Sequence, residues 1–182
     1  MLKLIFIICI FIISTYIGFA YGETFRRRQD ELKEILKALT ILENDIVYGT
    51  TPLPEALENL SYKLSKPLNK FVEAIVNRLI KGDVESVYEG AAQEFVLLEN
   101  EFYLYDEDKK IMSDFFKSLG ESGVYGQGKI FCLAIEGIKI NLKDADEIAK
   151  KNIKLYRYLG VCFGAMITIF IIWNAQLIIK SL

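Results

Sequence analysis

The amino-acid sequence predicts an all-α protein, in which a six-helix bundle is flanked by one apolar transmembrane helix at each end of the chain. Along the middle of the chain, apolar residues recur at intervals of three and four, which is the spacing of one helix face. No stretch alternates apolar and polar residues over the length of a strand. Glycine, proline and capping residues divide the middle into short segments, which is typical of a helical bundle with short loops.

The first apolar segment, residues 1–22, is long enough to cross a membrane. Leu2 to Tyr21 contains a single charged residue, Lys3. A helix rises about 1.5 Å per residue, so about 20 apolar residues cross a hydrocarbon core about 30 Å thick. The alternative is a cleaved signal peptide, for which Ala20 and Gly22 resemble a cleavage site. Because the apolar run is long and arginines follow it directly, we favour a retained transmembrane helix.

The second apolar segment, residues 159–180, contains no charged residue from Leu159 to Ile179. Basic residues adjoin the inner end of both segments. Arg26, Arg27 and Arg28 follow the first, and four precede the second: Lys150, Lys151, Lys154 and Arg157. Lys and Arg close to a span favour the cytoplasmic side of the membrane. The domain between the spans, residues 23–158, is therefore expected to face the cytoplasm.

Residues 23–158 are expected to form six amphipathic helices that pack as a bundle. The first is expected to end at Gly49, because glycine tolerates the left-handed conformation at a helix C-terminus. The next three helices are expected to start at the capping residues Thr51, Ser65 and Asp83. The fifth is expected to start at Asp106. No breaker separates the sixth from Leu159, so it is expected to continue into the second apolar segment.

The composition disfavours several classes of function. The chain has no histidine and three cysteines without a Cys-x-x-Cys pair, so neither a metal site nor a disulfide framework is expected. Its 22 basic and 24 acidic residues leave no basic excess, which disfavours a nucleic-acid partner. No serine or cysteine lies in a recognisable nucleophile motif. The chain is therefore expected not to be an enzyme and to need no cofactor or small-molecule substrate.

The segment from Gly123 to Lys129 matches the start of a phosphate-binding loop, G-x-x-x-x-G-K. In such a loop the residue after the lysine is Ser or Thr and holds magnesium, whereas here it is Ile130. The preceding segment has the pattern of a helix and not of the buried strand that such a loop follows. We therefore interpret the segment as a turn between helices.

Two clusters of charge are candidates for interaction. Asp106, Glu107 and Asp108 lie at the expected start of the fifth helix, where negative charge complements the helix dipole, and are expected on its exposed surface. Four lysines of the sixth helix lie close to the second span: Lys139, Lys143, Lys150 and Lys151. These lysines are expected either to contact anionic lipid or to determine topology, and topology is favoured.

Four blocks of sequence, taken in order along the chain, match the pattern of a known protein family. They are an apolar span ending near Gly18 and followed by arginines; Gly49 with Pro52, Leu53, Ala56 and Leu57; Leu119, Gly120 and Glu121 with Gln127; and Tyr156 with Leu159 and Gly160. Over nearly its whole length the chain thereby resembles the stage III sporulation protein AB family, which is related to the F platform protein of type II secretion systems. The resemblance implies an F-like helical domain between two spans.

The resemblance also implies a role. Members are non-enzymatic membrane components of a secretion-like channel complex between mother cell and forespore, and are required for endospore formation. The expected location is the mother-cell-derived membrane around the forespore. The expected partners are the lipid bilayer, the secretion-type ATPase of the complex and its other membrane subunits, and a homo-oligomer is compatible with this role. The candidate ATPase contacts are Asp106, Glu107 and Asp108.

Two alternatives remain at this stage. One is a platform protein of type II secretion or of type IV pili, although such proteins usually carry two F-type domains and three spans. The other is an unrelated membrane-tethered adaptor bundle, which would associate with no ATPase.

Overall fold

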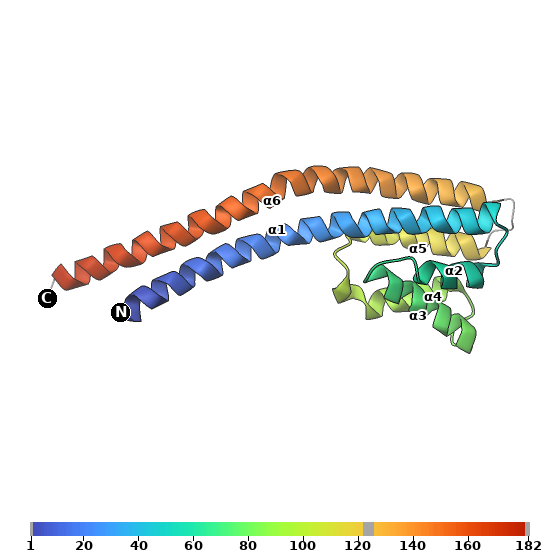
Figure 1. Cartoon of the computed structure of the whole chain (residues 1–182), viewed down its shortest axis with the longest axis horizontal. Helices are drawn as coiled ribbons and strands as arrows, with labels where there is room; N and C mark the ends of the chain where they lie inside the picture. Colours follow the sequence, from blue (N-terminus) through green and yellow to red (C-terminus); the bar gives the residue numbers. More distant parts are fainter. Residues whose placement is uncertain (1, 122–125, 181–182) are drawn as a thin grey trace. The chain divides into compact units, whose positions relative to one another are not determined.

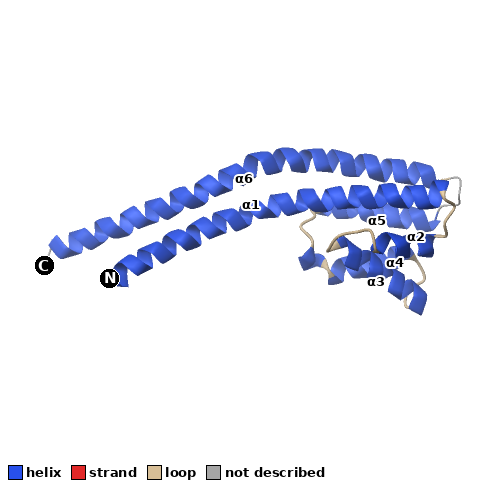
Figure 2. Ribbon diagram, in the orientation of Figure 1, coloured by secondary structure: helices blue, strands red, loops and turns tan. Residues whose placement is uncertain are grey.

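The computed structural model describes residues 2–121 and 126–180, and these residues form helices and loops but no strand (Figure 2). Six α-helices lie within the described ranges (Figure 1): α1 (Leu2–Glu43), α2 (Leu53–Ser61), α3 (Leu68–Lys81), α4 (Val87–Leu97), α5 (Asp106–Glu121) and α6 (Gln127–Lys180). A π-helical turn (Asn44–Tyr48) follows α1, and a 3-10 turn (Glu99–Glu101) follows α4. The predicted all-α fold class is confirmed.

The described residues form two compact units. We call residues 2–27 with 146–180 the terminal unit, and Arg28–Ala145 the bundle unit. Helices α1 and α6 contribute to both units because neither is interrupted. The expected continuity of the last helix into the second apolar segment is therefore confirmed. Helix α1 is also continuous past the end of the first apolar segment, where no proline intervenes, and this continuity was not predicted.

Three expected helix caps are wrong. Pro52 and Pro67 stand at the N-cap positions of α2 and α3 in place of Thr51 and Ser65. Helix α4 is capped by Ser86 and not by Asp83; the Ser86 hydroxyl accepts a hydrogen bond from the Glu89 backbone N–H at 3.1 Å. The physical reason is the Ser-x-x-Glu pattern, in which the Ser86 hydroxyl caps the helix and the Glu89 carboxylate reaches one residue past the N-cap and accepts from the Glu85 backbone N–H at 3.0 Å.

The glycines at two helix ends behave differently. Gly82 adopts a left-handed conformation with φ 72° and ends α3, as glycine commonly does. Gly49 was expected to do the same, but its φ is −83° and the following residue, Thr50, takes φ 54° instead. Glycine is required at position 49 for space, because a Cβ there would lie 2.7 Å from the Asp45 carbonyl oxygen.

The core of the bundle unit is aromatic and aliphatic. Consecutive helices pack against one another, α2 on α3, α3 on α4 and α4 on α5. Phe71 of α3 is fully buried, with ring centroids of Phe95 at 4.5 Å, Phe102 at 5.9 Å and Phe116 at 6.0 Å. Buried residues recur at helical spacing on α1 and α6 as well: Leu32, Ile35, Leu39 and Leu42, and Phe131, Ala134, Ile138 and Ala145. This apolar burial is the main favourable term that holds the helices together.

The terminal unit is a close-packed pair of helices. A Cβ added at Gly18 of α1 would lie 2.6 Å from the Tyr156 carbonyl oxygen and 2.8 Å from the Gly160 Cα of α6. The Ser14 hydroxyl donates a hydrogen bond to the Gly160 carbonyl oxygen at 3.1 Å. Small residues that admit close backbone approach are typical of helix pairs in membranes, where no hydrophobic effect drives helices together.

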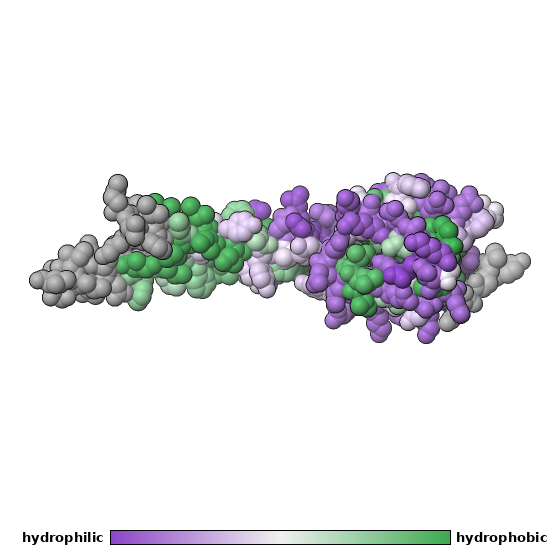
Figure 3. Space-filling model, turned by 90° about the horizontal axis from the view of Figure 1, so that it is seen from below, coloured by the Kyte–Doolittle hydropathy of each residue, from purple (hydrophilic) through white to green (hydrophobic). Residues whose placement is uncertain are grey.

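Helices α1 and α6 are both long and apolar enough to cross a membrane. Each has a mean hydropathy of 1.4 in its apolar part, yet only 11 % of that part is buried within the molecule. A core helix of a soluble protein would be mostly buried. Figure 3 shows the resulting contrast, with hydrophobic residues over the described part of the terminal unit and mainly hydrophilic residues over the bundle unit.

Candidate functional site

A buried polar cluster in the bundle unit centres on the carboxylate of Asp108, which is 0 % exposed. The Arg28 guanidinium binds it with two hydrogen bonds, from Nε to Oδ2 at 2.7 Å and from Nη2 to Oδ1 at 3.0 Å. The Tyr105 backbone N–H donates to Oδ2 at 2.9 Å, and the Asn141 side-chain amide donates to Oδ1 at 2.7 Å. These four residues are called the Asp108 cluster below.

Local sequence explains how Asp108 is placed. It is the third residue of α5, and an acidic residue at this position reaches back to the backbone N–H just before the helix, as Asp108 does to Tyr105. The Tyr105 ring also stacks on Arg28, whose guanidinium carbon lies 3.8 Å from the ring centroid. A planar guanidinium suits both contacts, because it binds a carboxylate with two parallel bonds and stacks on an aromatic face.

The Asp108 cluster connects three helices. Arg28 belongs to α1, Asp108 to α5 and Asn141 to α6. Each carboxylate oxygen accepts two hydrogen bonds, so the cost of burying the charge is offset by a bidentate partner and two further donors. These hydrogen bonds join α1, α5 and α6 inside the bundle unit.

The expectation that Asp108 lies on an exposed surface is wrong, because its side chain points inward at the third position of the helix. Asp106 and Glu107 of the same acidic run are exposed. The Asp106 carboxylate lies 3.9 Å from the ammonium of Lys109, which is also 3.5 Å from the Glu99 carboxylate. Asp106 and Glu107 are therefore accessible to a partner, and their contact with an ATPase stays a prediction.

Of the basic residues next to the two apolar segments, some are exposed and one is buried. Arg26 and Arg27 are exposed in the terminal unit, whereas Arg28 is 5 % exposed and belongs to the Asp108 cluster. On α6, Lys150 and Lys151 are exposed. The carboxylate of Asp146 accepts a hydrogen bond from Lys150 and raises the pKa of that ammonium group. The assignment of these residues to membrane topology stays a prediction.

The residues that carry the family resemblance lie at helix ends and in packed interfaces. Pro52 and Leu53 begin α2 after Gly49, and Ala56 and Leu57 are fully buried in the core. Gly120 and Glu121 are the last residues of α5, and Gln127 is the first of α6. Tyr156, Leu159 and Gly160 lie on α6 in the terminal unit, where Gly160 packs on Gly18. These positions are spread over both units.

The phosphate-binding-loop match falls partly outside the described residues, since it includes 123–125. Its remaining part is a turn at Gly126 and the first turn of α6, which contains Gly128 and Lys129. The segment before it is the helix α5, as the sequence predicted. A strand does not precede it within the described range, so the structural context of a phosphate-binding loop is missing.

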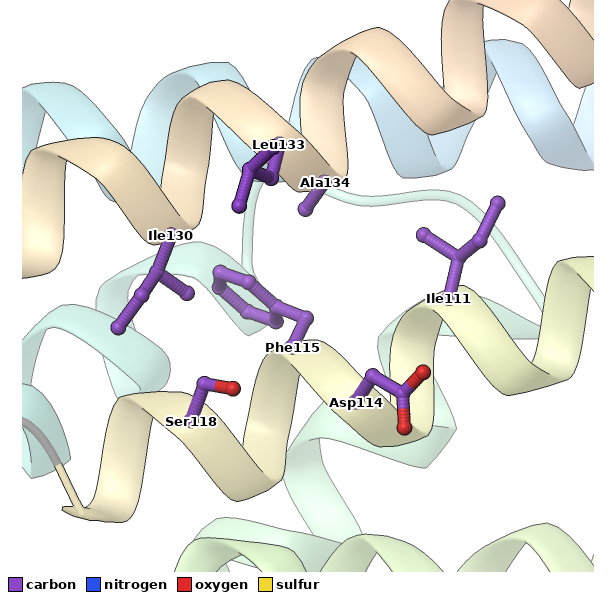
Figure 4. A pocket seen from close by; sticks show the side chains of 7 residues that line it. All are labelled: Ile111, Asp114, Phe115, Ser118, Ile130, Leu133 and Ala134. Atoms are coloured by element: carbon purple, nitrogen blue, oxygen red, sulfur yellow. The ribbon is translucent and has the colours of Figure 1, made fainter.

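A pocket of about 270 Å³ lies between α5 and α6 in the bundle unit (Figure 4). Figure 4 shows Phe115 pointing from α5 toward α6, with Asp114 and Ser118 on the same helix. The remaining lining is apolar: Ile111, Ile130, Leu133 and Ala134. One carboxylate and one hydroxyl supply neither a base–nucleophile–orienter set nor a metal site. Among the described residues, no group of three or more potential metal ligands comes together.

Sequence reasoning missed the Asp108 cluster and a second partly buried ion pair, between Arg78 of α3 and Glu94 of α4. The signal at Asp108 was present, because an acidic residue three positions after a helix cap commonly turns back to the backbone. Nothing in the sequence identified Arg28 as its partner, since the two residues are 80 positions apart.

The chain is similar to known proteins over most of its length. Residues 3–172 match the model of the family described as stage III sporulation protein AB. The chain is 26 % identical over 167 residues to the stage III sporulation protein AB of Bacillus subtilis (strain 168). The alignment covers 92 % of this chain and 97 % of that protein. A solved structure of stage III sporulation protein AB (SpoIIIAB) has the same fold, with a TM-score of 0.62 at 24 % identity, over 68 % of this chain and 96 % of that one.

Proposed function

The chain belongs to the stage III sporulation protein AB family, and we propose that it is a non-enzymatic membrane component of a secretion-like channel between mother cell and forespore. Family membership supports a role in sporulation. In the proposal, the bundle unit is a cytoplasmic platform that couples the ATPase of the complex to its membrane subunits, and the chain is required for endospore formation. The host membrane is the mother-cell-derived membrane that surrounds the forespore.

Charge and hydropathy support the membrane location and the orientation. Two helices are long and apolar enough to cross a bilayer, and little of their apolar surface is buried within the molecule. Four exposed basic residues adjoin the inner ends of these apolar stretches: Arg26 and Arg27 follow the first, and Lys150 and Lys151 precede the second. Basic residues at that position favour a cytoplasmic domain.

The observation that carries the coupling role is the Asp108 cluster. Of the described helices, α1 and α6 contain the two apolar segments, and the cluster ties both of them to α5 through charged hydrogen bonds. A displacement of α5 by a partner would therefore act on the same two helices that enter the membrane. Exposed Asp106 and Glu107 begin α5, so a partner that binds there would contact the helix that bears the cluster.

The non-enzymatic role is supported by the chemistry of the described residues. The chain has no histidine, the buried carboxylate of Asp108 has no solvent contact, and the α5–α6 pocket is lined mainly by apolar side chains. The protein is thus proposed to act by binding and by transmitting movement.

Deletion and complementation in the endospore-forming host test this proposal. Deletion is expected to arrest cells after engulfment and to reduce heat-resistant spores by several orders of magnitude, and the wild-type chain should restore them. Co-purification of the complex's ATPase with the tagged, membrane-extracted chain tests the partnership. Normal spore counts after deletion would refute the sporulation role, and absence of the ATPase from a complex that restores sporulation would refute the coupling role.

A further inference from the structure

We propose that the terminal unit binds the headgroups of anionic phospholipids through a basic stripe on α6 formed by Lys151, Lys154 and Arg157. The inference depends on insertion of the two spans but not on the ATPase. It identifies a lipid preference that the chain retains after insertion, beyond the use of basic residues to set topology.

Charge is divided unequally between the two units. The terminal segments, residues 1–27 and 146–182, contain eight basic and three acidic residues, whereas Arg28–Ala145 contains 14 basic and 21 acidic residues. The bundle unit therefore carries a net charge of about −7. Lys3 and Lys180 lie at the outer ends of the apolar segments, so the inner flanks of these segments keep six basic and three acidic residues, a net charge of about +3. A positively charged surface beside a bilayer attracts anionic lipids, at about 1 kcal/mol for each Lys or Arg close to the surface.

The stripe has helical spacing and is exposed. Lys151, Lys154 and Arg157 follow one another at intervals of three, so they lie along one side of α6, and all three side chains are exposed. The neighbouring Lys150 is different, because it donates a hydrogen bond to Asp146 one turn earlier. Within the described ranges, Lys151 and Lys154 form no ion pair. Their ammonium groups are therefore available to an external anion.

Arg157 is held at the edge of the apolar segment. Its guanidinium carbon lies 4.9 Å from the centroid of the Phe19 ring on α1. Stacking uses the face of the guanidinium and leaves its N–H groups directed outward in the plane of the group. A planar guanidinium with free N–H groups binds phosphate oxygens in a bidentate manner.

Aromatic residues next to Arg157 in the terminal unit are typical of a membrane–water interface. Tyr156 packs between Tyr21 and Phe25 of α1, with ring centroids at 5.1 Å and 5.6 Å, and Tyr158 is 70 % exposed. Tyrosines concentrate where hydrocarbon meets headgroups. Along the helix axis, Arg157, Lys154 and Lys151 precede Leu159 by about 3, 8 and 12 Å. The headgroup layer is about 5–8 Å thick on each side, and long basic side chains extend toward it, so all three can reach phosphates.

The test uses the full chain purified in detergent micelles. Native mass spectrometry measures binding of phosphatidylglycerol and of phosphatidylethanolamine at equal concentrations. The wild-type chain is expected to prefer phosphatidylglycerol by at least tenfold, and the preference should decrease between low and high salt. The triple variant K151Q/K154Q/R157Q should lose the preference. The matched control K129Q/K139Q/K143Q removes three exposed lysines from α6 in the bundle unit and should retain it.

Orientation is measured separately. Cys132 is exposed on α6 in the bundle unit, so a membrane-impermeant maleimide applied to intact cells or to inverted vesicles reports on which side the bundle unit lies. This measurement tests the cytoplasmic orientation independently of lipid binding. The lipid proposal is overturned if the wild type shows no preference, if the triple variant keeps it, or if the control loses it equally. If the wild type shows no preference, the basic stripe acts only in setting the membrane topology.

Discussion

Arg28 of α1 and Asp108 of α5 form a buried, bidentate ion pair, although 80 positions separate them in the chain. The same carboxylate accepts hydrogen bonds from the Tyr105 backbone and from Asn141 of α6. Burial removes both charges from water, and only this complete set of partners offsets that cost. The pair therefore specifies how α1, α5 and α6 align in the bundle unit.

Replacing Asp108 by Asn is expected to destabilise the bundle unit strongly. The variant keeps the shape of the side chain but leaves the Arg28 guanidinium buried without a counter-charge, which costs about 3–5 kcal/mol. At about 2–4 °C per kcal/mol for a chain of this size, the Tm should fall by about 10 °C. Circular dichroism of the full chain in detergent micelles, followed during heating, measures this shift.

The matched control for Asp108→Asn is Asp106→Asn, two residues earlier, where the carboxylate is exposed. This variant is expected to change stability by no more than about 0.5 kcal/mol. In the double variant R28M/D108N the loss should be smaller than the sum of the single losses, because the two groups interact directly. Additive losses, or equal losses for Asp106→Asn and Asp108→Asn, would contradict the importance of the pair.

The stability of the chain should depend on pH through Glu34 of α1. Burial alone would raise the pKa of this carboxyl group, but hydrogen bonds from the Ser65 backbone N–H and from Lys37, with the Lys37 charge, lower the pKa below 4.5. The folded state thus favours the charged carboxylate. Its contribution is fully present above the unfolded pKa and is lost as the pH falls through the lower folded pKa.

The measurement compares Tm for the wild type and Glu34→Gln from pH 7 to pH 3. The variant should be less stable at neutral pH, and the difference should shrink as the pH falls below about 4.5. Glu58→Gln, which removes an exposed carboxylate from α2, serves as the control for charge alone. A difference that is constant over the whole pH range would argue against the Ser65 and Lys37 contacts.

Two glycines one turn apart on α1 should respond differently to alanine. At Gly18 the added Cβ would overlap backbone atoms of Tyr156 and Gly160, at 2.6 Å and 2.8 Å. At Gly22 the nearest atom would be the Ile153 carbonyl oxygen at 3.6 Å, which is ordinary contact. Gly18→Ala is therefore expected to weaken packing of the two spans by about 1–3 kcal/mol. Gly22→Ala should be neutral, or stabilising by up to about 1 kcal/mol through helix propensity.

Thermal unfolding of the two variants in the same micelles provides the comparison. Because each variant adds one methyl group to the same helix, a general effect of the substitution would appear in both. Equal Tm values for Gly18→Ala and Gly22→Ala would show that the close approach of α1 and α6 at Gly18 does not contribute to stability.

The exposed acidic start of α5 is the proposed ATPase contact, and charge reversal tests it. The variant D106K/E107K should reduce co-purification of the ATPase at least fivefold, because opposite charges at the contact would become like charges. Helicity measured by circular dichroism should not change. Reversal of exposed Glu55 and Glu58 on α2 is the control for net charge, and binding equal to wild type by D106K/E107K would remove this contact from the proposal.

The sequence alone determined that the chain is helical and where its apolar segments lie, because the signals for these features are local. Helical periodicity, the start of α5 at Asp106 and the length of the apolar segments each depend on residues within a few turns. The family resemblance was equally accessible, since its blocks are contiguous. The expected caps at Thr51, Ser65 and Asp83 failed where prolines or the nearby Ser86 cap competed for the same helix start.

Only the tertiary structure decided which polar residues are buried and which helices contact. The position of Asp108, three residues after the helix cap, is a local signal for its contact with the Tyr105 backbone, but not for its burial. Among the three acidic residues at the start of α5 only Asp108 is buried, because Arg28 and Asn141 come from distant helices to meet it. Gly18 and Gly160 likewise acquire their close contact only when α1 and α6 pair. Which helices pair depends on the summed packing of whole helices. Local periodicity identifies the apolar face of a helix but not the helix that packs against it.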